Sequence, residues 1–199
     1  VKLSDSYIGP ESASTVFVDG FESGSFSAWS GTTVTSGESG TVVNTLSHDG
    51  SYSARFTSNG GGGWENAYCY RDLSSYSELY ARGYFYVSQS GIADDNDRHQ
   101  FMVLTAGSSS VAYVGWKRVS GVVQWSLIVR HGTSYVSVYS ASSPSLNMWY
   151  CVELHWRGDS VNGLGELWVD GALVCSLTGK NTAAYGDVNQ VRYGLEYLY

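Results

Sequence analysis

The stretch Gly165–Val174, GELWVDGALV, decides the fold class of this chain. Apolar and polar residues alternate on both sides of Asp170-Gly171, and this pair favours a two-residue type I′ turn between antiparallel strands. The turn predicts a β-hairpin in which Val169 faces Ala172, Trp168 faces Leu173 and Glu166 faces Cys175.

The same pattern extends upstream through further hairpins. A Ser120-Gly121 turn in WKRVSGVVQW places Trp116 opposite Trp125, Val114 opposite Leu127, and Lys117 opposite Gln124. A loop at 131–134 then sets Arg130 opposite Tyr135 and Leu127 beside Val138. A turn in GDSVNG, residues 158–163, sets His155 opposite Glu166 and Glu153 opposite Trp168.

Period-two alternation dominates from Thr41 onward, and no long window shows an apolar stripe at helical spacing. Turn signals recur at short intervals, as in sandwiches and barrels of antiparallel strands. We therefore predict an all-β fold with one domain over residues 15–199, preceded by an N-terminal arm over residues 1–14 that leads into a short strand at Thr15–Val18.

The registered hairpins separate the strands into two faces. The face predicted to be buried carries Val114, Trp116, Trp125, Leu127, Val129, Val136, Val138, Val152, Leu154, Trp156, Leu167 and Val169. The opposite face carries tyrosines and polar side chains, and the strand at 80–87 repeats the division, with Tyr80, Arg82, Tyr84 and Tyr86 on the polar side.

Composition excludes several classes of partner. The formal net charge is −7 with a pI near 4.9, and no basic run is present, which argues against nucleic acid. No apolar stretch is long enough to insert in a membrane. Few Lys residues and many Ser, Thr and Tyr favour a secreted or cell-surface protein. Cys69, Cys151 and Cys175 allow at most one internal disulfide, and buried free thiols are the alternative.

Four segments together resemble the concanavalin A-like lectin and glucanase superfamily, in its laminin-G-like branch. They are DGFESGSFSAWS at 19–30, HDGSYSARF at 48–56, MWYCVELHW at 148–156 and GELWVDGALV at 165–174. The resemblance implies an antiparallel two-sheet jelly-roll sandwich with a carbohydrate groove across a concave sheet. That superfamily includes lectins, glycosidases, polysaccharide lyases and structural domains, so the resemblance leaves the function open.

The polar face predicts a lectin-like site for a polysaccharide or glycan, because aromatic rings stack on the apolar faces of sugars. The predicted carbohydrate-binding residues are Tyr84, Tyr86, Tyr113, Lys117, Gln124, Arg130, Tyr135, Tyr139 and Trp168. The alternative is that tyrosine occupies these positions because it suits half-buried strands, or that the face packs on another subunit.

An enzyme is the rival interpretation, as a polysaccharide lyase or glycosidase acting in the same groove. Its catalytic candidates are Glu153, His155, Glu166, Tyr84 and Arg82, since adjacent acids and an imidazole permit general acid–base chemistry. The catalytic motifs of known enzymes with this fold are missing, and a cross-strand His–Glu pair is also an ordinary structural contact.

The acidic N-terminal stretch suggests a structural calcium ion, although the fold requires no cofactor. Hard oxygen ligands are available at Asp19 and Glu22, and the resemblance adds Asp187, the acid before the last strand. The alternative is a loop in which Phe21, Phe26 and Trp29 cover an end of the core.

A third interpretation is a structural subunit of an extracellular filament, adhesin or particle. The N-terminal arm would then drive self-assembly by adding the Thr15–Val18 strand to a neighbouring sheet.

Overall fold

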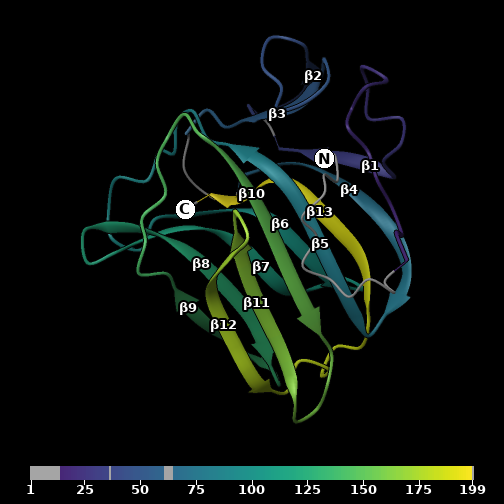
Figure 1. Cartoon of the computed structure of the whole chain (residues 1–199), viewed down its shortest axis with the longest axis vertical. Coiled ribbons are helices and arrows are strands. Elements are labelled where there is room, and N and C mark those ends of the chain that lie inside the picture. Colours follow the sequence, from purple (N-terminus) through teal and green to yellow (C-terminus); the bar gives the residue numbers. More distant parts are fainter. Residues whose placement is uncertain (1–13, 36, 61–64, 199) are drawn as a thin grey trace.

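The computed structural model describes residues 14–35, 37–60 and 65–198. These residues form strands and connecting turns without any helix, so none of them belongs to a helix long and apolar enough to span a membrane. The strands are β1 Gly31–Val34, β2 Ser39–Val43, β3 Ser53–Thr57, β4 Glu65–Tyr76, β5 Glu78–Tyr86, β6 Arg98–Ala106, β7 Ser109–Val119, β8 Val122–His131, β9 Ser134–Tyr139, β10 Trp149–Arg157, β11 Gly163–Val169, β12 Ala172–Lys180 and β13 Val188–Leu198 (Figure 1).

The strands form a sandwich of two antiparallel sheets with a small added ribbon. The large sheet has seven strands in the order β1-β4-β13-β6-β7-β8-β9, and the small sheet has four in the order β12-β11-β10-β5. Strands β2 and β3 pair only with each other and lie beyond one end of the sandwich (Figure 1). The predicted all-β jelly-roll sandwich is confirmed.

The core lies between the two sheets and is built from the face that alternation marked as apolar. Trp116, Leu127 and Val129 of the large sheet and Leu154, Trp156 and Leu167 of the small sheet are fully or almost fully buried. Each such side chain contributes about 1.5–3 kcal/mol through burial, so the core is stable without disulfides. Val136 and Val138, on the edge strand β9, are only partly buried.

The predicted hairpin registers are confirmed with one exception. Trp116 pairs with Trp125, Arg130 with Tyr135, and His155 with Glu166. The exception lies in the β11–β12 hairpin, where Glu166 pairs with Ser176 rather than with Cys175. The register shifts between Leu167 and Trp168, because an irregularity of the β-bulge kind inserts an extra residue on one strand.

The described cysteines are all free thiols, which is consistent with the predicted alternative to a disulfide. Cys175 packs in the core, whereas Cys151 lies on the outer face of the small sheet beside Tyr84. Opposite faces keep their sulfur atoms apart. Burial raises the pKa of the Cys175 thiol to about 11 and raises that of Cys69 further, so both remain protonated and unreactive.

Residues 14–20 contain no strand, so the predicted strand at Thr15–Val18 is wrong. This segment instead packs through its aromatic side chain, since Phe17 meets Trp29 edge to face with ring centroids 5.1 Å apart. The segment is anchored by packing rather than by sheet hydrogen bonds, and this removes the structural motive for strand addition by Thr15–Val18. The rest of the predicted arm, residues 1–13, lies outside the described residues.

Candidate functional site

The predicted carbohydrate-binding face is divided between the two sheets. Tyr84, Tyr86 and Trp168 stand on the outer face of the small sheet. The other predicted residues, Tyr113, Lys117, Gln124, Arg130, Tyr135 and Tyr139, belong to the large sheet. The prediction that these residues share one face is therefore wrong. Strand β5 pairs with β10 in the small sheet, and the outer faces of the two sheets of a sandwich point in opposite directions.

The large sheet carries a pocket of about 350 Å³ on its outer face, which we name the tyrosine pocket. Strands β6 to β9 supply its lining, which consists of Arg98, Gln100, Tyr113, Lys117, Ile128, Tyr135, Ser137 and Tyr139. Four of these residues, Tyr113 and Lys117 of β7 and Tyr135 and Tyr139 of β9, were predicted from the alternation of their strands. Gln124 lies in the same row as Lys117 but does not line the pocket.

Hydrogen bonds hold the tyrosine rings in fixed positions. The hydroxyl groups of Tyr113 and Tyr135 lie 3.1 Å apart, and Tyr135 also donates to the carbonyl of Ser110. Lys117 Nζ lies 3.5 Å from the hydroxyl oxygen of Tyr139, which is also 3.0 Å from Ser137 Oγ. The pocket thus presents rings and hydroxyl groups whose orientation is set in advance of ligand binding.

Arg130 supports the edge of the pocket rather than lining it. Its guanidinium carbon lies 3.8 Å from the centroid of the Tyr135 ring and 4.4 Å from that of Tyr185. Its nitrogens donate to the carbonyls of Ser110 and Thr133. The Arg130 guanidinium makes cation–π contacts with both rings, so Arg130 acts as a positioning residue for Tyr135.

The charged side chains that line the tyrosine pocket are positive, although the chain has a net charge of −7. Its described lining contains two cations, Arg98 and Lys117, and neither Asp nor Glu. Sequence reasoning missed Arg98 and Gln100, although their spacing in Arg98-His99-Gln100 was a usable signal. Alternate residues of a strand share a face, so these two side chains reach the pocket while His99 turns into the core.

Polar side chains continue across the large sheet next to the pocket. Gln190 donates to Asp72, Arg192 donates to Gln190, and Arg192 also pairs with Glu196 at 2.9 Å. Glu196 stands opposite Gln100 in the sheet. Burial raises the pKa of the Glu196 carboxyl, and the Arg192 guanidinium opposes this shift. These side chains extend the polar surface of the large sheet from the pocket over β13 and β4.

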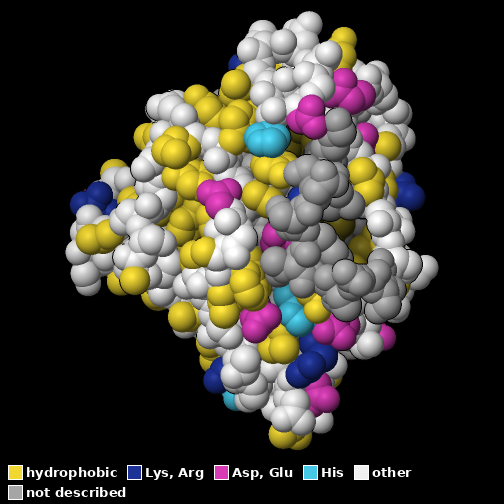
Figure 2. All heavy atoms as spheres, viewed as in Figure 1, with side chains coloured by type: hydrophobic (Ala, Val, Ile, Leu, Met, Phe, Trp, Pro, Cys, Tyr) yellow, Lys and Arg dark blue, Asp and Glu magenta, His cyan; other side chains and the backbone are white. Residues whose placement is uncertain are grey.

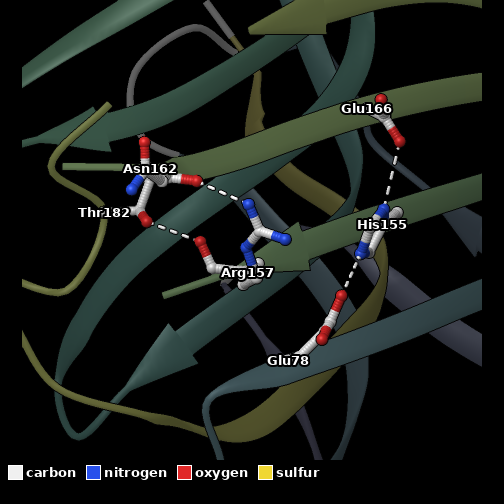
Figure 3. Close-up of polar contacts among 6 residues, drawn as sticks. All are labelled: Glu78, His155, Arg157, Asn162, Glu166 and Thr182. Carbon is white, nitrogen blue, oxygen red and sulfur yellow. Dashed lines mark hydrogen bonds and ion pairs between the residues drawn. The ribbon is translucent and has the colours of Figure 1, made fainter. Parts of the chain in front are cut away.

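The predicted catalytic residues gather on the outer face of the small sheet. His155 lies between two carboxylates, with Nδ1 3.1 Å from Glu166 Oε2 and Nε2 2.7 Å from Glu78 Oε1 (Figure 3). The Tyr80 ring stacks on the imidazole at 4.0 Å. Each ring nitrogen thus lies within hydrogen-bond distance of a carboxylate, and the imidazole links Glu78 on β5 to Glu166 on β11.

Arg82, Glu153 and Tyr84 complete the predicted catalytic set on that face. Arg82 and Glu153 are buried and pair at 3.9 Å, and the Tyr84 ring stacks on His48 at 3.7 Å. Figure 2 looks onto this side of the molecule, where acidic side chains are scattered and Lys and Arg are few. On this face Arg82 is paired with Glu153, and His155 lies beside Glu78 and Glu166.

Asp19, Glu22 and Asp187 do not form one ligand group. Asp19 accepts hydrogen bonds from the Phe21 amide and from Trp29 Nε1, the latter at 2.7 Å. Glu22 accepts from the amides of Ser51 and Tyr52. Within the part of the chain that the structure describes, no three His, Cys, Asp or Glu residues could hold a metal ion. The predicted calcium set is thus unsupported, and the two N-terminal acids tie loops together.

Replacement of Asp19 by Ala is expected to lower the free energy of unfolding by about 2 kcal/mol, because two hydrogen bonds to a carboxylate are lost. Denaturant unfolding measures this change, and Asp187→Ala, which changes an exposed acid, is the matched control. Suppose instead that both substitutions destabilise the protein equally and that a chelator destabilises the wild type by the same amount. That result would contradict the hydrogen-bond role of Asp19 and would support the predicted calcium site.

The sequence matches no protein-family model and no curated protein. Solved structures do resemble it. An endo-β-1,4-glucuronan lyase from the fungus Trichoderma reesei shares 14% identity at a TM-score of 0.65, over 86% of this chain and 81% of that one. The cellulose-induced protein Cip1 shares 17% sequence identity at a TM-score of 0.63, over 89% of this chain and 88% of that one. The T. cruzi calreticulin globular domain shares 10% identity at a TM-score of 0.56, over 92% of this chain and 83% of that one. At these identities the likeness shows the fold alone, and that fold is the concanavalin A-like jelly roll.

Proposed function

We propose that this chain binds an anionic polysaccharide, of the uronate-containing class, in the tyrosine pocket. The observation that carries the proposal is the charge of the pocket: Arg98 and Lys117 line it without a described carboxylate, in a chain of net charge −7. Such a pocket attracts carboxylates and disfavours cations. It refines the predicted lectin-like function by naming the sheet, the residues and the charge of the glycan.

The residues of the pocket suit the parts of a uronate sugar. A guanidinium such as that of Arg98 can bind a carboxylate through two parallel hydrogen bonds, and Lys117 adds a second positive charge. The Gln100 amide can bind hydroxyl groups, and the rings of Tyr113 and Tyr139 offer apolar faces for the C–H side of a pyranose. A polymer of this kind occurs outside cells, in agreement with the secreted or surface location that composition favours.

The similar structures support this choice of ligand class. One of them is, by name, a lyase of glucuronan, which is a polymer of uronate units, and its fold superposes over most of both chains. We therefore choose polyglucuronate as the first ligand to test, with an uncharged glucan of similar linkage as the control polymer.

Replacement of Lys117 by Ala is expected to weaken polyglucuronate binding by about tenfold, because a charge-assisted hydrogen bond contributes about 1.5–3 kcal/mol. Lys180→Ala is the matched control, since Lys180 ends β12 and does not line the pocket. Calorimetric titration at two salt concentrations measures both effects. Equal affinity for the uncharged glucan, or equal loss in both variants, would refute the proposed site.

Cleavage by β-elimination is the second candidate function, and the Lys117–Tyr139 contact favours it. In that reaction a base removes the C5 proton of a uronate, the C4–O4 bond breaks, a C4=C5 double bond forms, and the leaving oxygen takes up a proton. A phenol oxygen beside an ammonium group can exchange protons in both steps. Arg98 and Gln100 would hold the carboxylate whose charge increases as the C5 proton leaves.

Ultraviolet absorbance of the unsaturated product separates a lyase from a binding module. If the chain is a lyase, Tyr139→Phe is expected to abolish product release while the affinity for polyglucuronate changes by less than about threefold. Tyr86→Phe is the control, because it removes a phenol hydroxyl from the small sheet, outside the tyrosine pocket. Absence of product from the wild-type protein, together with retained binding, would leave the module as the function.

A further inference from the structure

A second and larger cavity lies between the β2–β3 ribbon and the end of the sandwich. Its volume is about 960 Å³, within the range of small-molecule sites. Arg98 is the only described residue that lines both this cavity and the tyrosine pocket. The side of the cavity on the small sheet is aromatic, and its four rings, which we name the aromatic platform, are His48, Tyr84, Tyr86 and Trp149.

The aromatic platform is built from three separate segments of the chain. Tyr86 of β5 stands opposite Trp149 of β10, with ring centroids 5.4 Å apart. His48, in the loop that joins β2 to β3, stacks on Tyr84 at 3.7 Å and meets Trp149 edge to face at 5.4 Å. The Tyr86 hydroxyl also donates to Asn147 Oδ1 at 3.3 Å. These contacts fix the Trp149 and His48 rings in position before a ligand binds.

The platform lies at the surface of the molecule. All four of its rings are half-buried, and Met148, which precedes Trp149, is 52% exposed. Figure 2, in the orientation of Figure 1, shows apolar side chains gathered where β5 ends and β10 begins. A ligand can therefore reach these rings directly from solvent.

Two side chains of the platform carry polar groups that are open to a ligand. Trp149 Nε1 and both ring nitrogens of His48 form no hydrogen bond with any described residue, and none of these atoms is buried. An indole N–H only donates, whereas a neutral imidazole donates through one nitrogen and accepts through the other. Hydroxyl groups, which both donate and accept, can pair with all three atoms.

The charge of the platform separates it from the tyrosine pocket. None of its four residues is Lys or Arg, so a uronate carboxylate would gain no charge-assisted pair with them. Glu22, which is held by the amides of Ser51 and Tyr52, adds a negative charge to the same cavity lining. An uncharged sugar fits better, because aromatic rings bind the C–H face of a pyranose and the nitrogens bind its hydroxyl groups.

We infer that the aromatic platform is a second glycan-binding site, for an uncharged oligosaccharide, with a pyranose ring stacked on Trp149 and hydroxyl groups on His48 and Trp149 Nε1. This inference is independent of the proposed function, because the two sites lie on different sheets and differ in charge. It assigns a role to the β2–β3 ribbon, whose connecting loop supplies His48 while the ribbon pairs with neither sheet of the sandwich.

The test uses cellotetraose as the uncharged ligand and tetraglucuronate as the charged comparator. Nuclear magnetic resonance titration of the whole ¹⁵N-labelled chain follows the indole and imidazole nitrogen signals, and the Trp149→Ala spectrum assigns the Trp149 signal. We expect cellotetraose to shift the Trp149 and His48 signals with a dissociation constant of about 1 mM, and tetraglucuronate to leave them unmoved. In Trp149→Ala, the affinity for cellotetraose should fall about tenfold.

Matched variants keep the test decisive. Trp168→Ala removes another half-buried tryptophan from the same face of the small sheet, outside the cavity, and should leave cellotetraose binding unchanged. If Trp149→Ala failed to fold, His48→Ala, a change in a loop, should still weaken binding. Unmoved Trp149 and His48 signals, or equal affinity in Trp149→Ala and wild type, would overturn the inference.

The tyrosine pocket is tested separately in the same experiment. Lys117→Ala, which weakens polyglucuronate binding at that pocket, should leave the affinity for cellotetraose unchanged. Loss of cellotetraose binding in Lys117→Ala would place the uncharged sugar in the tyrosine pocket and overturn the inference. Failure at the platform, in turn, would leave the effect of Lys117→Ala on polyglucuronate as it stands.

Discussion

Replacement of Gly115 by Ala is expected to lower the free energy of unfolding by about 3 kcal/mol and to abolish ligand binding at the tyrosine pocket. A Cβ atom at this position would overlap the carbonyl oxygen of His99 and lie 2.8 Å from the Cα of Gln100. Both are backbone atoms, so the contact is relieved only by moving β6 away from β7. Gly115 is therefore needed for space rather than for its backbone conformation.

The loss of binding follows from the position of Gly115 in the sheet. It stands between Tyr113 and Lys117 on β7 and pairs with Gln100 on β6, so any separation of these strands shifts the pocket lining. Gly20→Ala is the control, because its added methyl group meets only Glu22 at 3.7 Å. Denaturant unfolding and polyglucuronate titration measure the two effects. A Gly115→Ala protein with wild-type stability and affinity would show that β6 and β7 can separate without cost.

Acidification is expected to destabilise the wild-type protein by about 3 kcal/mol more than the His99→Phe variant between pH 7 and pH 4. The pKa of His99 is about 4 in the folded chain, against an ordinary value of 6.5. The unfolded chain therefore binds the proton first. The contribution of neutral His99 to the free energy of unfolding is therefore fully present above pH 6.5, and it is lost as the pH falls towards the folded pKa of about 4.

Carboxylates also titrate between pH 7 and pH 4. The difference in the free energy of unfolding between wild type and His99→Phe isolates the contribution of His99, because the carboxylates are the same in both proteins. At pH 7 the His99→Phe protein should be at least as stable as wild type, since it removes two buried nitrogens that no described residue satisfies. Urea unfolding of both proteins at pH 7, 5.5 and 4 gives the comparison. Parallel stability curves for the two proteins would mean that His99 reaches water or an acid in the folded state.

Local turn chemistry explains why so much of the fold was predictable from sequence. Asp170-Gly171 and Ser120-Gly121 fix hairpin registers by themselves, and each register then assigns every side chain of its strands to a face. Trp116 and Trp125 could therefore be placed in the core from the alternation of their strands alone. The one error in register arose at an irregularity after Leu167, which no turn signal marks.

Pairing between distant strands was not predictable in the same way. The tyrosines of β5 and of β7 alternate alike, and nothing local shows that β5 pairs with β10 while β7 pairs with β6. This is why one predicted carbohydrate-binding face became two. Arg98 and Gln100 were missed for a related reason, since β6 is apolar for most of its length and its pocket residues stand at one end. The Glu78–His155–Glu166 network was only partly predicted, because Glu78 lies on β5 and the pairing of β5 with β10 could not be inferred from local sequence.

The position of β13 affects how the chain can be made in a cell. This strand lies between β4 and β6 in the large sheet, yet it is the last strand in sequence. During synthesis β4 and β6 are made long before β13, which pairs with both of them. Until β13 is made, each of these two strands therefore has one unpaired edge. The large sheet can therefore close only after β13 has been synthesised, and a nascent chain paused before Val188 should be prone to pair with neighbouring chains through these edges.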